Sequence, residues 1–367
     1  MKIARSLSFL LISLSTSWGQ FQPAPETKEE NPDVAIGHNG LKYRIIRDWA
    51  KVDREIAPVI NAHAMAEGSD GNFYLVTDHP KNAIIVFDSK GNYLRSIGKG
   101  LQGGHGIDFI KSGNEEFIIH VDCGWDFSEK GKPTKAFGGV NILKKDGTLV
   151  RSFPSPVDLE LTKKGTFYGP CDVAVTPDNT ILVVDGYGSN LVMEFSLEGK
   201  LIHHWGGSKK NDPATIQNGH GISIDYADPK NPVVWVSSRS ENKLKLFTLK
   251  GKHLETLDLP GAYAGQAVFH GDAIYTGVCW SKNPKTKRQA PRSGFVLVLD
   301  RKTRKVISAP GGEKPVYLDG KLQPMKQDLR AFRHVHDLMV DKEGNIYVME
   351  WNAGCRYPTK LELIKGD

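Results

Sequence analysis

Short apolar segments separated by polar turns recur along most of the chain. In the clearest copy, apolar stretches over 172–175, 181–184 and 191–195 are separated by turns, and the hairpin turn 198–200 follows. The segments are rich in β-branched residues, and no long stretch has the 3.6-residue periodicity of a helix. The pattern predicts an all-β chain built from hairpin-connected strands.

Six copies of this unit can be aligned on the polar residue with which each begins. They begin at His63, His105, Cys171, His220, Gln266 and His336, in steps of 42, 66, 49, 46 and 70 residues. The shorter steps match the ~40–50 residues of one propeller blade. The longer steps contain Gly-, Pro- and Lys-rich insertions near 124–139, 280–294 and 310–332. We therefore expect a six-bladed β-propeller, with four-stranded antiparallel blades around a central channel.

The N-terminal segment has the order of features found in a secretory signal. Lys2 and Arg5 precede an apolar run over 7–14, and small residues follow. We expect residues 1–19 to be a signal peptide, which would make the protein extracytoplasmic, either secreted or periplasmic.

The remainder of the chain is expected to form a single domain. Residues 20–40 are Pro-rich and charged, which predicts a disordered lead-in. Residues 41–367 are expected to form the propeller, with a strand at 41–46 completing the last blade and closing the ring.

Composition narrows the classes of partner. The net charge of +6 comes from scattered Lys and Arg without a nucleic-acid-binding motif, so no nucleic acid is expected. No segment approaches the ~20 apolar residues of a membrane span. We expect a monomer. The four cysteines lie far apart, and the sequence neither selects a disulfide pairing nor excludes free thiols.

Histidines begin four of the six copies, where the innermost strand of a blade lines the channel. His105, His220 and His336 belong to alternate copies, about 120° apart in a six-fold ring, so their imidazoles can converge on the axis. Three His ligands with an open fourth position are typical of catalytic zinc. His63 lies at the same level. The alternative is four ordinary polar residues at strand starts beside a crowded axis.

These residues resemble a known family, the NHL-type propellers, and within it the peptidyl-α-hydroxyglycine α-amidating lyases. The segments 105–108 and 220–223 look like the family's His-Gly zinc strands, and 335–338 resembles its final Pro-His-Asp strand. Residues 185–187 resemble the segment with the active-site tyrosine, and 238–242 the segment with an active-site arginine. The resemblance extends from about residue 63 to the end.

The resemblance implies two metal ions. The expected Zn²⁺ ligands are His105, His220 and His336. A structural Ca²⁺ is expected on the opposite side of that level, bound by Asp337 and by the backbone carbonyls of Met65 and Ile107, because oxygen-only ligation suits Ca²⁺. The alternative for Asp337 is a turn residue or a hydrogen-bond partner of a histidine.

The resemblance also implies an activity, the zinc-dependent cleavage of a carbinolamide C–N bond that releases an amide and glyoxylate. The substrate would be a small peptide-like or α-hydroxy compound at the mouth of the channel. Tyr187 would act as a general base or orient the substrate hydroxyl, with its pKa lowered by nearby cations. Arg239 would hold the substrate carboxylate. A packed aromatic and a surface ion-pair residue are the respective alternatives.

Departures from the family pattern leave the activity open. A further family arginine falls at Asp78, which is followed by His79, and a family half-cystine is Gly188. His63 stands where the lyase has no ligand, so His63, Asp78 and His79 are additional site candidates. One hypothesis is an amidating-lyase-like enzyme with an altered substrate. The other is a non-catalytic propeller that binds a protein, peptide or glycan. A lactonase-like hydrolase is disfavoured by the histidine-rich ring.

Overall fold

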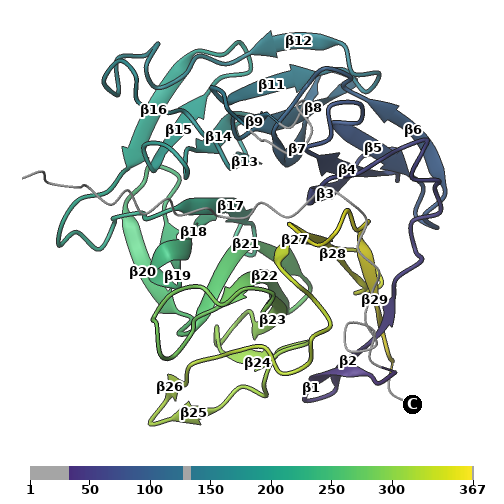
Figure 1. Cartoon of the computed structure of the whole chain (residues 1–367). Helices are drawn as coiled ribbons and strands as arrows, with labels where there is room; N and C mark the ends of the chain where they lie inside the picture. The colour runs from purple at the N-terminus through teal and green to yellow at the C-terminus, as the bar shows by residue number, and fades with distance from the viewer. Residues whose placement is uncertain (1–32, 127–133, 366–367) are drawn as a thin grey trace, which may run out of the picture.

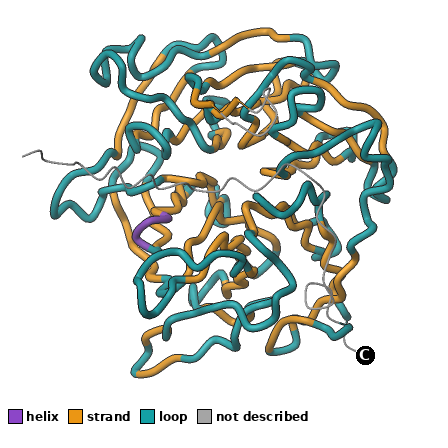
Figure 2. Tube along the Cα trace, viewed as in Figure 1, coloured by secondary structure: helices purple, strands orange, loops and turns teal. Residues whose placement is uncertain are grey.

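Antiparallel sheets surround a central axis (Figures 1 and 2), in a computed structural model that describes residues 33–126 and 134–365. Five sheets have four strands and a sixth has five. The predicted all-β, six-bladed propeller is confirmed. Within the described residues, helix is confined to the 3-10 turn η2 (Arg239–Glu241), and no helix is long and apolar enough to cross a membrane. The predicted signal peptide lies outside the described residues.

The first three blades run outward from the axis in chain order. Blade 1 consists of β3 (Ala62–Glu67), β4 (Phe73–Thr77), β5 (Ile84–Phe87) and β6 (Tyr93–Ile97). Blade 2 consists of β7 (Gly104–Ser112), β8 (Glu115–Asp122), β11 (Gly139–Leu143) and β12 (Leu149–Ser152), with an inserted hairpin, β9 (Trp125–Asp126) and β10 (Thr134–Lys135). Blade 3 consists of β13 (Asp172–Val175), β14 (Ile181–Val184), β15 (Leu191–Phe195) and β16 (Leu201–Gly206).

The last three blades repeat this order, except at the ring closure. Blade 4 consists of β17 (Gly219–Asp225), β18 (Val233–Ser238), β19 (Lys243–Phe247) and β20 (His253–Asp258). Blade 5 consists of β21 (Ala262–His270), β22 (Ala273–Ser281), β23 (Phe295–Asp300) and β24 (Val306–Ser308), followed by the hairpin β25 (Tyr317–Leu318) and β26 (Lys321–Leu322). Blade 6 consists of β27 (Val335–Val340), β28 (Ile346–Glu350), β29 (Thr359–Leu363), β2 (Leu41–Ile46) and β1 (Ile36–His38).

Chain segments from the two ends close the ring in blade 6. Strand β2 pairs with β29, so the strand expected at 41–46 is present (Figure 1). Strand β1 pairs with β2 and lies inside the lead-in predicted for 20–40, so that prediction is wrong for 36–38. The physical reason is that Ile36 is buried, at 1% exposure, in the apolar cluster between blades 5 and 6.

The hydrophobic core is divided among the gaps between blades. Six clusters of buried apolar residues each fill one gap, from the gap between blades 1 and 2 to the gap between blades 6 and 1. Each blade therefore buries both faces, and its central strands read as continuous apolar runs such as β14 and β23. This packing holds the innermost strands in a rigid ring around the axis.

A β-bulge coincides with each of the four channel histidines. The pairing register shifts at the same place in β3, β7, β17 and β27, and the histidines at these shifts are His63, His105, His220 and His336. A bulge adds one unpaired residue and re-aims its side chain relative to the strict alternation of a strand. All four histidines are buried, at 3–4% exposure. The repeated bulge is the local device that gathers them.

Gly221, next to His220, provides a test of this crowding. A Cβ there would meet the backbone nitrogen of Gln266 at 2.5 Å, whereas a Cβ at Gly139 has open space around it. We expect Gly221→Ala to lower the free energy of unfolding by about 1–3 kcal/mol through overpacking at the axis. Gly139→Ala is the matched control and should differ little from the native protein. Denaturant unfolding measures both, and equal stabilities would contradict axial crowding.

Candidate metal centre in the central channel

A pocket of about 290 Å³ opens at the end of the channel where the innermost strands begin. The second strand of each blade is antiparallel to the first, so it ends at the same face. The residues at or just beyond these ends form the wall of the pocket. They are Asp78, Trp125, Tyr187, Arg239, Trp280 and Trp351, one from each blade in order. The histidines lie at its base.

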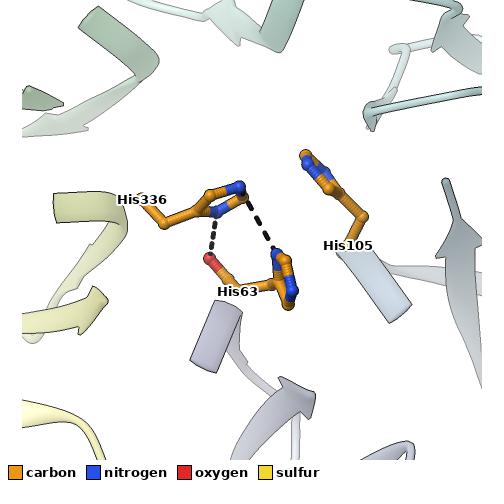
Figure 3. A group of neighbouring side chains, drawn as sticks. All are labelled: His63, His105 and His336. Carbon is orange, nitrogen blue, oxygen red and sulfur yellow. Dashed lines mark hydrogen bonds between the residues drawn. The ribbon is translucent and has the colours of Figure 1, made fainter. Parts of the chain in front are cut away.

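The histidine rings converge as the sequence predicts. Ring centroids are 4.7 Å apart for His105 and His220, 4.5 Å for His105 and His336, and 4.6 Å for His220 and His336. His63 joins them, 4.5 Å from His336 and 5.1 Å from His105. Within the described residues, one ring nitrogen from each of His63, His105 and His336 lies within 4.8 Å of the other two (Figure 3). This group contains His63 and does not include the predicted ligand His220. This buried group can hold a metal ion.

Hydrogen bonds fix how two of these rings are oriented. Nδ1 of His105 lies 2.6 Å from the carbonyl oxygen of Cys171, and Nδ1 of His336 lies 2.9 Å from the carbonyl oxygen of His63. A carbonyl only accepts, so each Nδ1 carries the proton and each Nε2 offers a lone pair. Burial lowers the pKa of His105 and His336 well below the ordinary value, which favours the neutral form that binds metals.

Tyr187 lies between two of the histidines. Its hydroxyl is 3.1 Å from Nε2 of His105 and 2.9 Å from Nε2 of His220. Burial raises the pKa of Tyr187 well above its ordinary value, and the opposing effect of Arg239 is smaller. Among the residues of the chain, desolvation therefore outweighs the cationic Arg239 in setting the pKa of this phenol.

The loop that carries Tyr187 is held by Asp185. Its carboxylate accepts hydrogen bonds from the backbone N–H of Gly169 at 2.9 Å and of Ser189 at 2.6 Å. The next residue, Gly186, lies so close to the backbone of Gly219 that a Cβ on Gly186 would clash with the Gly219 carbonyl. The Asp-Gly-Tyr segment therefore places the phenol by a carboxylate anchor and a close approach that only glycine permits.

Arg239 is buried at 2% exposure at the start of η2. Its guanidinium stacks over Trp280, 5.3 Å from the ring centroid. Within the described residues, its Nε and Nη2 atoms have no hydrogen-bond partner. A buried guanidinium that keeps free donors is costly to the fold unless an anion binds it. Arg239 therefore offers two unsatisfied donors in the wall of the pocket.

Asp78 and His79, the candidates that follow β4, have different places. Asp78 is buried and its Oδ2 lies 3.0 Å from Nε2 of His63. His79 is not among the residues that line the pocket, and its Nδ1 accepts a hydrogen bond from the backbone N–H of Lys81 at 3.1 Å. The structure therefore joins Asp78 to the histidine cluster and leaves His79 outside it.

Carboxylates lie beyond the histidines, on the other side of the ring. Asp337 and Asp172 line a cavity of about 10 Å³ behind His105, His220 and His336. Oδ1 of Asp337 has no partner in the described part of the chain, while Oδ2 of Asp172 accepts from the backbone N–H of Ile222. Burial raises the pKa of both carboxyls, that of Asp337 to about 7.

The backbone carbonyls proposed as calcium ligands occupy the neighbouring strands. Met65 lies in β3 and Ile107 in β7, and both residues are buried. Neither is among the residues that line the small cavity. Of the three predicted calcium ligands, Asp337 is therefore the one that lines the small cavity.

The sequence pattern did not identify Asp172 or the tryptophans of the pocket wall as site residues. Trp125, Trp280 and Trp351 lie at or just past the end of the second strand of their blades. Aligning the six copies on that strand end, as well as on their first residue, would have found them. Cys123, Cys171, Cys279 and Cys355 are buried and free, so the structure contains no disulfide among them.

No protein-family model matches the sequence. The chain is 24% identical over 276 residues to peptidyl-glycine alpha-amidating monooxygenase of Mus musculus, covering 73% of the chain and 24% of the relative. It is 24% identical over 298 residues to peptidyl-glycine alpha-amidating monooxygenase A of Xenopus laevis, covering 77% of the chain and 28% of the relative. The chain thus spans about a quarter of the length of these relatives.

A solved structure of a gluconolactonase from Xanthomonas campestris superposes with a TM-score of 0.53 at 11% identity, covering 94% of both chains. At that identity the likeness concerns the fold alone. The resemblance noted in the sequence is confirmed: this chain is a six-bladed β-propeller that is similar to the peptidyl-glycine α-amidating enzymes.

Proposed function

We propose that the protein is an extracytoplasmic, metal-dependent carbon–nitrogen lyase that cleaves a carbinolamide into an amide and glyoxylate. One observation carries the proposal: Arg239, whose Nε and Nη2 have no hydrogen-bond partner among the described residues, and Tyr187 line the same pocket as His63, His105 and His336. An α-hydroxy carboxylate substrate requires a cationic side chain for its carboxylate and, beside it, histidines that can hold a metal ion for its hydroxyl. The likeness to the amidating enzymes and the secretory-type N-terminus support it.

The donor set fits a zinc ion. Neutral imidazoles whose outer nitrogens donate to carbonyls are ordinary zinc ligands, and His105 and His336 are of this kind. The family resemblance assigns the zinc to these two residues and to His220. When bound, zinc supplies Lewis-acid polarisation of the substrate hydroxyl. Asp337, whose Oδ1 has no partner among residues 33–126 and 134–365, fits the calcium ligand that the resemblance implies.

The residues of the chain bind and orient the substrate. Arg239 forms paired hydrogen bonds with the glyoxylate-forming carboxylate. Tyr187, already within hydrogen-bond distance of His105 and His220, orients the hydroxyl. In the reaction the C–N bond breaks with its electron pair on nitrogen, the hydroxyl loses its proton as the carbon becomes a carbonyl, and nitrogen gains a proton. The tryptophans exclude water around these steps.

Glyoxylate release from N-benzoyl-α-hydroxyglycine tests the proposal. We expect turnover by the zinc-loaded protein, and a fall in kcat/KM of roughly 100-fold in Arg239→Ala, the equivalent of about 3 kcal/mol for a lost charged hydrogen-bonding pair. Arg44→Ala removes an exposed arginine on β2 and is the matched control. Absence of glyoxylate with the zinc-loaded native protein would refute the lyase, and an unchanged Arg239→Ala would refute the carboxylate grip.

A non-catalytic binding propeller is the second candidate. Asp78 stands where the resembling lyases have an arginine, so one half of their substrate grip is missing. Three tryptophans in the wall also give the pocket an apolar surface suited to a peptide or glycan. Binding of such a ligand without turnover of the carbinolamide would favour this candidate.

A further inference from the structure

Asp78 and His63 form a buried pair beside the cluster, and Asp78 is 1% exposed. Its Oδ1 accepts from the backbone N–H of Asn61 at 2.9 Å, and its Oδ2 accepts from the Asn61 side chain at 2.6 Å. Oδ2 also lies 3.0 Å from Nε2 of His63, the ion-pair partner that the structure gives this carboxylate. The donors from Asn61 are neutral, so a negative charge on this buried carboxylate would be balanced through His63, by a second proton on its ring or by a cation that the ring binds.

The carboxylate also sets which nitrogen of His63 faces the cluster. Because an ionised carboxylate only accepts, Nε2 of His63 carries a proton, and in the neutral ring Nδ1 then holds a lone pair. That Nδ1 lies 3.4 Å from Nε2 of His336 (Figure 3). Nε2 of His336 holds a lone pair as well, since its Nδ1 donates to the carbonyl of His63.

Two facing lone pairs at this distance require a positive charge between or beside them. A single proton shared by His63 and His336 would serve that pair and would leave the third nitrogen of the group, on His105, to the hydroxyl of Tyr187. A divalent cation would be held by one ring nitrogen from each of the three histidines, and these nitrogens lie within 4.8 Å of one another. It also offsets the charge of Asp78 through the imidazole, as carboxylate–histidine–metal triads do.

We propose that His63 is a metal ligand through Nδ1 and that Asp78 is the residue that positions it. The inference rests on the metal site of the proposed function but extends it, because the resembling lyases have no ligand at the position of His63. At the position where those lyases have a further arginine, this chain has Asp78, whose carboxylate positions the proposed ligand His63. The carboxylate of a substrate is then left to Arg239 alone.

Metal binding without substrate tests this inference. Zinc affinity is measured by competition with a chromophoric chelator, and coordination by the visible absorption of the Co²⁺-substituted protein. His63→Gln keeps an amide that can donate to Asp78 but removes the ring nitrogen. Asp78→Asn removes the negative charge. His79→Gln is the matched control, since His79 lies on the same loop outside the pocket.

We expect Asp78→Asn to weaken zinc binding by about 10–100-fold, the usual cost of losing an outer partner of a ligand. His63→Gln should weaken it further and alter the Co²⁺ spectrum, while His79→Gln should match the native protein. Circular dichroism confirms that each variant is folded. Native affinity and an unchanged Co²⁺ spectrum in His63→Gln would overturn the inference, as would a native protein that takes up no zinc.

The lyase assay has a separate readout. Glyoxylate release can fail while His63→Gln still loses zinc, which would leave the ligand assignment standing and refute the proposed reaction. Conversely, turnover with undiminished zinc binding in His63→Gln would refute the ligand and support the reaction.

Discussion

His105→Ala is expected to abolish metal loading and to lower the turnover of the proposed lyase reaction by roughly 1,000-fold or more, because Lewis-acid stabilisation is worth several kcal/mol. The ring of His105 lies 5.1, 4.7 and 4.5 Å from the rings of His63, His220 and His336, and its Nε2 is 3.1 Å from the hydroxyl of Tyr187. It also belongs both to the zinc ligands that the resemblance implies and to the group that the structure brings together. Its loss therefore removes a ligand from either set.

Elemental analysis after zinc loading and the glyoxylate assay measure the two effects. His204→Ala is the matched control, because His204 is exposed on the outer strand β16. A His105→Ala protein that keeps a stoichiometric zinc ion would show that His105 is not a required metal ligand.

Tyr43→Ala is expected to lower the free energy of unfolding by about 3–5 kcal/mol, the usual cost of emptying a large buried aromatic site. Tyr43 lies in β2, has no exposed surface, and packs in the cluster between blades 5 and 6. It pairs with Leu363 on β29, so it belongs to the seam where the two ends of the chain meet. A domain is stable by only about 5–15 kcal/mol, so this loss is a large share of the total.

Urea unfolding followed by tryptophan fluorescence measures the change. Lys42→Ala removes an exposed neighbour on the same strand and should shift stability by less than about 0.5 kcal/mol. If Tyr43→Ala lowered the free energy of unfolding no more than Lys42→Ala does, the burial of Tyr43 at the seam would not be what holds the ring closed.

The repeat made the fold readable from the sequence. The copies that begin at His63, His105, His220 and His336 do start on innermost strands, and the strand at 41–46 does close the ring. Strand β1 was not predicted, because Ile36–His38 is short and follows a Pro-rich, charged segment. Its stability comes from packing against blade 5. Local pattern does not report such a long-range contact.

The candidate site was partly readable for a similar reason. The channel histidines share one position in the repeat, so alignment finds them. The sequence identified Asp78 only as a residue that replaces a family arginine. The folded ring is needed to show that its carboxylate lies 3.0 Å from Nε2 of His63. The raised pKa of Tyr187 was missed because burial cannot be read from neighbours in sequence. Trp125 and Trp280 lie in or beside insertions that interrupt the repeat.

The wall of the pocket is assembled from six separate segments at or just beyond the ends of the second strands, each contributed by a different blade. Such segments can accept substitutions or changes of length without disturbing the apolar clusters between the blades. The recognition of a ligand can therefore diverge one blade at a time while the histidine base is retained. Exchange of single loops between related propellers is consequently a practical route to new specificities on this scaffold.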